Sequence, residues 1–420
     1  MKKLLIVFFL VGCSIETVET AEGIKEDIFV TEEVTNKKVS ERSYLVVDTN
    51  QSKSFNNMNV ITDTYGTNFE GQDSDFNGYS PEYEDNGDGT VSDLVTGLMW
   101  SQSPDINDNG VINSDDKLTY EKGMESAGDL NLAGYSDWRI PSIKELYSLI
   151  MFSGQDISGY SEGNTDSFVP FINTDYFDFA YGDVSSGERL IDSQYMSSTL
   201  YVDTDNYDTL LFGVNFADGR IKGYGLQGMG GTDKTFAMIY VRGEEYGTNS
   251  FVDNGNTVSD VATGLMWSST DFGTMTWEEA LTFASESEHA EFSDWRLPNA
   301  KELQSIVDYS KSPDTTNSAA ISDLFELTKF INEDGEEDYG YYLTSTTHEN
   351  MINGGSAVYI SFGRAMGYMQ NSWLDVHGAG AQRSDPKIGD ITDYPYGHGP
   401  QGDAIRIENY VLLVRDIKTP

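Results

Sequence analysis

The sequence predicts an α+β protein that contains two tandem copies of one module, and three observations support this prediction. Sequence blocks in the first half of the 420 residues recur in the same order in the second half. Gly makes up 41 residues, many of them in Asn-Gly, Asp-Gly and Gly-Gly pairs, which are typical of tight turns between short strands. Each copy also contains two segments with helical spacing behind N-cap signals. We therefore expect two helices and several short antiparallel strands in each copy.

The repeated blocks define where the copies begin and end. Thr-Gly-Leu-Met-Trp ends at Trp100 and again at Trp267, and Ser-Asp-Trp-Arg contains Trp138 and Trp295. Both copies continue with Lys-Glu-Leu and close on an apolar run that ends in Val-Arg. The two predicted copies span residues 84–243 and 250–417.

Within each copy, we predict a hairpin, then two helices, then strands. A Thr precedes the first helix, where Thr276 forms a predicted capping box with Glu279 in copy two, and a capping box with Glu at the third helical position begins the second helix. β-Branched and aromatic residues predict the strands. The predicted N-caps are Thr119, Ser142, Thr276 and Asn299. The predicted strands are residues 210–216, 237–242, 358–362 and 410–415.

Trp138-Arg139 and Trp295-Arg296 allow two interpretations. An exposed indole could stack on a sugar ring. Because each pair lies in a turn before a capped helix, we favour a core Trp beside an Arg that forms an ion pair.

The N-terminus resembles a bacterial lipoprotein signal. Two Lys residues precede an apolar run too short to span a bilayer, and Leu-Val-Gly-Cys follows it. We predict that residues 1–12 are removed and that Cys13 is acylated, which anchors the protein at an outer membrane or cell surface. The alternative is an ordinary secretory signal with an incidental cysteine. Because Cys13 is the only Cys, an intramolecular disulfide and cysteine chemistry are excluded.

The next two segments precede the repeats. Residues 13–43 are polar and acidic without a sustained period, and we predict a flexible tether. Residues 44–83 are predicted to form an extension that packs on the modules.

The net charge disfavours several classes of partner. Lys and Arg number 26 against 69 Asp and Glu, which gives a net charge of −43. Nucleic acids, anionic bilayers and heparin-like polyanions are bound by basic patches, so we expect none of them as a partner. Membrane contact is expected through the lipid anchor only.

An insertion in copy one, between its two Trp blocks, predicts a calcium site. A loop of the EF-hand type needs alternating oxygen ligands, a Gly at the tight turn and one backbone carbonyl. The predicted ligands are Asp105, Asn107, Asn109, the carbonyl of Val111, and Asp116. The alternative is a solvated turn rich in Asp and Asn. Copy two has no such ligand set at the equivalent place.

The ordered blocks of both copies resemble the Lcl C-terminal domain family, also called domain of unknown function 1566. The resemblance implies C-type-lectin-like modules and a role at the cell surface, because the family takes its name from a collagen-like bacterial adhesin that binds host glycosaminoglycans. A fold does not by itself determine function. The strong acidity of this chain conflicts with binding of sulfated glycans.

Copy two has a long stretch, residues 368–403, that the duplication does not explain. Long irregular loops in compact domains often contribute function, although a structural loop over the module interface is the alternative. Sugar recognition combines aromatic faces with planar polar groups, and this stretch supplies both. The predicted ligand contacts are Trp373, His377, Arg383, Tyr394 and His398.

Enzyme signatures are absent from the sequence. The four His form no His-Glu-x-x-His, and no Gly-x-Ser-x-Gly or phosphate loop occurs. We therefore predict a lipid-anchored surface protein that binds a glycan, with calcium assisting adhesion, and that has no catalytic activity. The alternatives are a structural envelope protein that acts by protein contacts, and an unrecognised hydrolase. Paired carboxylates in a deep cleft would favour the hydrolase.

Overall fold

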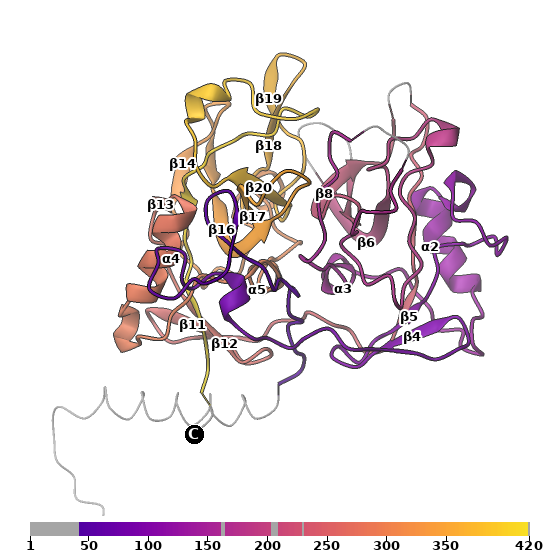
Figure 1. The fold of residues 1–420 in the computed structure, drawn as a ribbon, viewed down its shortest axis with the longest axis horizontal. Helices are drawn as coiled ribbons and strands as arrows, with labels where there is room; N and C mark the ends of the chain where they lie inside the picture. The colour runs from indigo at the N-terminus through magenta and orange to yellow at the C-terminus, as the bar shows by residue number, and fades with distance from the viewer. Residues whose placement is uncertain (1–41, 161–163, 203–208, 229–230, 419–420) are drawn as a thin grey trace, which may run out of the picture.

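The computed structural model describes residues 42–160, 164–202, 209–228 and 231–418 (Figure 1). The predicted signal peptide, the predicted lipidation site at Cys13 and most of the predicted tether lie outside these residues. Within the described part of the chain, no helix is long and apolar enough to cross a membrane. We call residues 84–243 module 1 and residues 250–417 module 2.

Each module contains a small four-stranded antiparallel sheet. In module 1 its strands are, in order, β3 (Tyr83–Asp85), β4 (Thr90–Asp93), β5 (Met99–Ser101) and β9 (Val241–Arg242). In module 2 they are β10 (Phe251–Asp253), β11 (Thr257–Asp260), β12 (Leu265–Ser268) and β22 (Val414–Asp416). The last strand of each module pairs with the strand that contains the repeated Trp, Trp100 or Trp267, and both indoles are fully buried.

The predicted helices are confirmed at their N-termini. The four predicted N-caps each accept a hydrogen bond from a backbone N–H of the first turn, and three of them form capping boxes. Thr119 lacks the box because Lys122 occupies the position where the other helices have Glu. The short helix α6 was not predicted. The helices are α2 (Tyr120–Asp129), α3 (Ile143–Ser148), α4 (Trp277–Glu286), α5 (Ala300–Ser305) and α6 (Pro313–Thr316).

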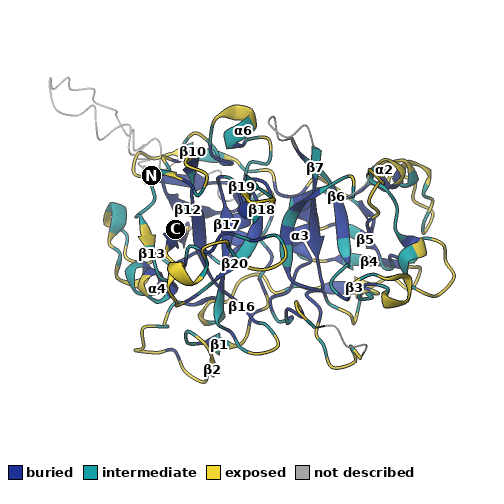
Figure 2. Cartoon of the chain, turned by 90° about the horizontal axis from the view of Figure 1, so that it is seen from above, coloured by how far each residue is buried: buried dark blue, intermediate teal, exposed yellow. Residues whose placement is uncertain are grey.

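Strands from both modules join in one eight-stranded sheet with the order β13-β21-β16-β17-β20-β8-β7-β6. Module 1 contributes β6 (Gln194–Val202), β7 (Thr209–Asn215) and β8 (Arg220–Gly225). Module 2 contributes β13 (Thr274–Met275), β16 (Tyr341–His348), β17 (Ser356–Ser361), β20 (Gln382–Pro386) and β21 (Asn409–Tyr410). The inner strands of the large sheet and α3 are buried in the middle of the molecule (Figure 2).

The junction between the modules is formed by β20, which lies within the extra stretch of copy two. It pairs along its length with β17 and meets β8 at Gln382 and Ile221. The Gly223 N–H also donates to the His377 carbonyl over 2.7 Å. The stretch that duplication does not explain therefore connects the two modules.

The remaining strands form three hairpins of two strands each. They are β1 (Ser54–Phe55) with β2 (Val60–Ile61), β14 (Lys329–Ile331) with β15 (Glu337–Tyr339), and β18 (Met366–Met369) with β19 (Ser372–Asp375). The observed helices and mostly antiparallel strands agree with an α+β protein.

The two predicted strands at the module ends are shorter than expected, because each of these apolar segments passes from the large sheet to the small one. In module 1, Ala237 bridges to Tyr195 of the large sheet, whereas Val241 pairs with Trp100. In module 2, the same change occurs between β21 and β22. The segments stay apolar throughout because they are buried on the way.

The repeated Trp-Arg turns confirm the core interpretation. Trp138 and Trp295 are each only 4% exposed. Arg139 forms a two-pronged ion pair with Glu145, and Arg296 forms the same pair with Glu302. The Glu of each capping box therefore also fixes the Arg of the preceding turn.

The Lys of each Lys-Glu-Leu block crosses to the other module. Lys144 Nζ, on α3, donates to the Ser305 carbonyl at the end of α5 over 2.7 Å. Lys301 Nζ, on α5, donates to the Ser148 carbonyl at the end of α3 over 2.8 Å. A cation at a helix C-terminus is stabilised by the carbonyls there. The repeat therefore builds a reciprocal contact between the modules.

The extension of residues 44–83 contacts both modules. The Gln51 side chain donates to the Phe152 carbonyl of module 1 and the Thr347 carbonyl of module 2. Buried Asp73 accepts hydrogen bonds from Thr49 and Thr346. Because burial outweighs these bonds, the pKa of Asp73 is raised to about 7.

Candidate functional site

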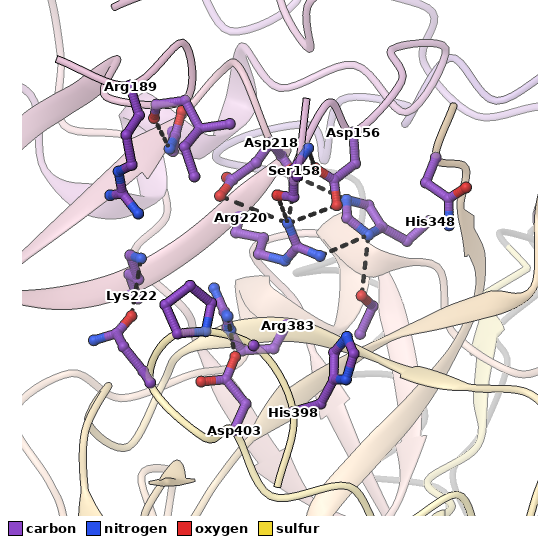
Figure 3. Close-up of a pocket in the computed structure, with 18 of the residues that line it drawn as sticks. Asp156, Ser158, Arg189, Asp218, Arg220, Lys222, His348, Arg383, His398 and Asp403 are labelled. Carbon is purple, nitrogen blue, oxygen red and sulfur yellow. Dashed lines mark hydrogen bonds and ion pairs between the residues drawn. The ribbon is translucent and has the colours of Figure 1, made fainter. Parts of the chain in front are cut away.

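A cavity of about 920 Å³ lies between the two modules, beside the junction of β8 and β20 (Figure 3). Its volume is in the range of small-molecule sites. Module 1 lines it with β8 and residues within 156–160, 188–194 and 234–236, and module 2 with β20 and residues within 348–352 and 394–405. Neither module alone encloses the space.

The cavity differs from the rest of the molecule in charge. Its lining contains five Lys or Arg and five Asp or Glu, whereas the whole chain has 26 against 69. The acids are Asp156, Glu188, Asp192, Asp218 and Asp403. The bases are Arg189, Arg220, Lys222, Lys234 and Arg383. A protein with strong negative charge therefore has a locally balanced, polar cavity.

Arg220, at the start of β8, organises one wall (Figure 3). Its Nη1 lies 2.8 Å from Asp156 Oδ2 and 3.6 Å from Asp218 Oδ2. Its Nη2 lies 3.5 Å from His348 Nδ1, and His348 Nε2 lies 2.8 Å from the Asp218 carbonyl. The wall thus combines two carboxylates, a guanidinium and an imidazole from both modules.

The surroundings move the pKa values of these groups in different directions. Burial raises the pKa of Asp218, although Arg220 opposes it. For Asp156, burial acts in the same direction, but Arg220 and His348 outweigh it and lower the pKa. Burial, with Arg220 adding to it, lowers the pKa of His348 to about 3, so this imidazole is neutral at physiological pH.

Arg383 and Asp403 organise the opposite wall. Arg383 Nη2 donates to Asp403 Oδ2, and His377 Nε2 lies 2.8 Å from Asp403 Oδ1. These partners outweigh burial and hold the pKa of Asp403 well below its usual range. Arg383 Nε and Nη1 are buried and have no hydrogen-bond partner among the described residues.

Lys222 lies on β8 beside this wall. Its Nζ donates to Gln401 Oε1 over 3.2 Å and lies 5.1 Å from the ring centroid of Tyr224. Across the described residues, it has no ion-pair partner within 4.0 Å. Burial, and then the nearby Arg383, lower the pKa of Lys222 to about 8, so the amine is mostly charged at neutral pH.

The structure brings three of the five predicted ligand contacts together. Arg383, Tyr394 and His398 line the cavity, and the last two rings pack edge to face at 6.0 Å. His377 lies behind the wall, 1% exposed, where it holds Asp403. Trp373 is on β19, outside the cavity lining, and packs on Tyr368.

Sequence reasoning missed the lining that module 1 and β16 supply. The missed residues that form the hydrogen bonds and ion pairs described above are Asp156, Asp218, Arg220, Lys222 and His348. One signal was present, since Gly219-Arg220 recurs as Gly363-Arg364. The repeated pair indicates a turn that both modules share. Arg220 becomes part of a cavity wall only because β8 meets β20.

The predicted calcium loop is held by its own hydrogen bonds. The Asp105 carboxylate accepts from the N–H groups of Asn109 and Gly110, and buried Asp116 accepts from the Asn107 amide and the Asn113 N–H. Gly110 has φ +81°, as the tight turn requires. In the described chain, no group of three or more His, Cys, Asp or Glu side chains could hold a metal ion. Besides the two carboxylates of Asp105 and Asp116, the predicted ligands are Asn oxygens and the Val111 carbonyl. Calcium binding stays a prediction.

The fold and the cavity define a protein of two tandem mixed modules that share one sheet. The family model of the Lcl C-terminal domain matches residues 89–242 and 256–377, more than half of the chain, and the chain therefore belongs to this family. No curated protein and no solved structure matches the chain. The matched ranges end before Arg383 and Asp403, so the family match alone does not describe the second wall of the cavity.

Proposed function

We propose that this chain is a non-catalytic binding protein of the bacterial surface whose intermodule cavity binds a short glycan. The observation that best supports this proposal is a polar cavity, lined by both modules, with balanced charge in a molecule of net charge −43. Long-range repulsion from the acidic surface acts on anionic polymers, whereas the cavity itself is locally neutral.

The chemistry of the lining suits a ligand with many hydroxyl groups. Carboxylates accept hydrogen bonds, guanidinium and ammonium groups donate them, and Asn, Gln and Ser side chains do both. Tyr160, Tyr394 and His398 provide ring faces and edges for the C–H surface of a sugar. A few convergent polar groups with aromatic neighbours are typical of small-ligand sites.

A hydrolase is the main alternative to a binding protein. Asp156 and Asp218 both lie in the cavity, and their pKa values are shifted in opposite directions, as those of an acid and base pair would be. Glycosidases place the scissile bond between two carboxylates. Here one nitrogen of Arg220 lies within 4 Å of both carboxylates and fills that position. Both side chains are also buried. This arrangement favours binding over hydrolysis.

The proposal that this protein is displayed at the bacterial surface is based on the predicted lipidation of Cys13 and on its membership of the Lcl C-terminal domain family. We propose lipid anchoring through Cys13 and C-type-lectin-like modules, in which the last strand returns to the small sheet beside its third strand and two repeated helices belong to each module. A Cys13→Ser variant should leave the membrane fraction or keep its signal peptide. Wild-type protein that partitions to the aqueous phase of a detergent extraction would contradict the anchor.

A glycan array probed with the full-length chain in mild detergent tests the binding proposal. We expect a small set of related short glycans to bind, and a Ser384→Trp variant, which narrows the cavity, to lose them. The matched control is Ser285→Trp, on the exposed side of α4. Hydrolysed array spots would favour the hydrolase. No bound glycan, together with reproducible cross-links to one envelope protein, would favour the structural role.

A further inference from the structure

We propose that the Lys222 and Arg383 side of the cavity binds a carboxylate, so that the glycan is an acidic saccharide such as one that ends in a hexuronic acid. This inference rests on the proposed function and adds the chemical class of the ligand. It concerns one anionic group in the cavity and does not extend to sulfated polymers.

Among the described residues, the ion pairs of the cavity leave two lysines without a carboxylate partner, Lys234, which is exposed, and Lys222, which is not. Arg189 pairs with Asp192, Arg220 with Asp156, and Arg383 with Asp403. Glu188 is taken by Lys117, which lies outside the lining. Lys222 has only the neutral Gln401 side chain and the Tyr224 ring. A largely buried cation without a counter-ion is costly, and a ligand anion would remove that cost.

Arg383 supplies the second part of the subsite. Its Nη2 is engaged by Asp403, while Nε and Nη1 are buried donors without partners among the described residues. Unmade hydrogen bonds of buried charged donors are rare in folded proteins. Hydrogen bonds from a cationic donor to a carboxylate are stronger than those to a neutral hydroxyl, so one carboxylate oxygen would satisfy one of these donors better than a sugar hydroxyl does, while the other oxygen reaches Lys222.

The charged groups around Lys222 do not oppose this placement. Arg383 and Arg220 are positive, and Asp218 and Asp403 are negative. Asp403 is neutralised by Arg383, and Asp218 shares Arg220 with Asp156. Burial also raises the pKa of Asp218, although Arg220 opposes this shift. An anion placed at Lys222 therefore meets one cation without a counter-ion, Lys222, and two arginines that are already paired with carboxylates.

The excess of positive charge at this subsite is small, and it therefore favours a single carboxylate over a highly charged group. One lysine and two free N–H groups of one arginine match a single negative charge with two oxygens. A sulfated polymer would have to place its further charges against a surface in which acids outnumber bases 69 to 26. We therefore expect weak binding of heparin by the same protein.

The test uses pairs of oligosaccharides that differ only in a terminal hexuronic acid or the corresponding neutral hexose. Isothermal titration of the full-length chain should give at least about tenfold tighter binding of the acidic member, a factor that corresponds to about 1.4 kcal/mol. Lys222→Met should remove the preference, and Lys222→Arg should keep most of it. The control is Lys329→Met, an exposed lysine on β14 that pairs with Glu337.

The outcomes separate this inference from the function on which it rests. If neutral glycans bind as tightly as their acidic partners, the carboxylate subsite is wrong while glycan binding stands. If Lys222→Met folds and keeps the preference, the subsite lies elsewhere. A Lys222→Gln variant serves the same purpose if the Met variant does not fold. If no member of either series binds, both proposals fail.

Discussion

The two modules contain the same Lys-Glu-Leu block, and the comparison of its two lysines shows how a repeat acquires different surroundings. Lys144 and Lys301 each donate to the last carbonyl of the other module's helix. Their remaining partners come from segments that are not repeated. Lys144 reaches the Gly247 carbonyl and the Asn249 side chain of the linker, whereas Lys301 reaches the Asp48 carbonyl of the N-terminal extension. The repeated block therefore determines the contact of each lysine with the other module's helix, whereas the flanking segments determine how deeply each lysine is buried.

A second difference follows the shared Gly-Arg turn and creates the cavity. After Arg220, β8 continues the sheet beside β7. After Arg364, β18 turns away and pairs with β19, and the inserted β20 takes the place beside β17. Arg364 binds Asp314 outside the cavity lining, whereas Arg220 lies in the lining, next to the junction of β8 and β20. The site exists because the copies diverged at this point.

Truncation of the repeated core Trp should have the largest effect. We expect Trp100→Ala and Trp267→Ala each to lower the free energy of unfolding by about 3–5 kcal/mol, because each removes a fully buried indole. Since the modules share a sheet and exchange lysine contacts, both variants should shift one common transition in calorimetry. Two separate transitions, with only one displaced, would show that the modules unfold independently.

The reciprocal lysines should differ in their pH dependence. Burial lowers the pKa of Lys301 to about 7 and that of Lys144 to about 8. A lowered lysine pKa means that the folded state disfavours the proton, so stability is highest above the unfolded pKa and is lost as pH falls toward the folded pKa.

The wild type should therefore lose stability as pH falls from about 10, at no more than about 1.4 kcal/mol per pH unit for each lysine. Denaturant midpoints should show that Lys301→Met removes a contribution to this loss that continues down to about pH 7, and that Lys144→Met removes a contribution that ends near pH 8. Equal pH ranges for the two variants would contradict the difference in burial.

Calcium should act on module 1 alone, because module 2 lacks the insertion. At a hundredfold excess over Kd, bound calcium would stabilise the folded state by about 2.7 kcal/mol. Chelation should therefore lower the melting temperature, and Asp105→Ala should remove the difference. The matched control is Asp129→Ala, an exposed acid of the same module. No response to millimolar calcium would leave the loop as a turn held by hydrogen bonds.

The first helices of the two modules should show the smallest effect. Thr276 forms a capping box with Glu279, while Thr119 accepts a single bond from Lys122. Thr276→Ala should cost about 1 kcal/mol in urea denaturation, and Thr119→Ala less than that. A larger cost at Thr119 would mean that neighbouring packing outweighs the box.

Short-range signals in the sequence were sufficient for the local features. The caps at Ser142 and Asn299 depend on residues three positions apart, and burial of Trp138 beside a paired Arg139 depends on the turn and helix that follow. The family and the tandem arrangement were likewise visible from repeated blocks.

Long-range pairing set the rest. Nothing within β20 or β8 indicates that Gln382 will meet Ile221, because register between distant strands depends on how the whole sheet packs. The wall with Asp156, Arg220 and His348 depends on that junction. For the same reason, His377 was predicted as a ligand contact and instead lies behind the cavity as the partner of Asp403.

The central claim, that the ligand site is shared by both modules, is tested most directly by titrating one glycan identified on the array into variants of each wall. We predict that Lys222→Met from module 1 and His398→Ala from module 2 each weaken binding by about tenfold or more. Tyr65→Ala, an 83% exposed position in the extension, should leave binding unchanged. Wild-type affinity in either wall variant, with the fold intact by circular dichroism, would contradict a site built between the modules.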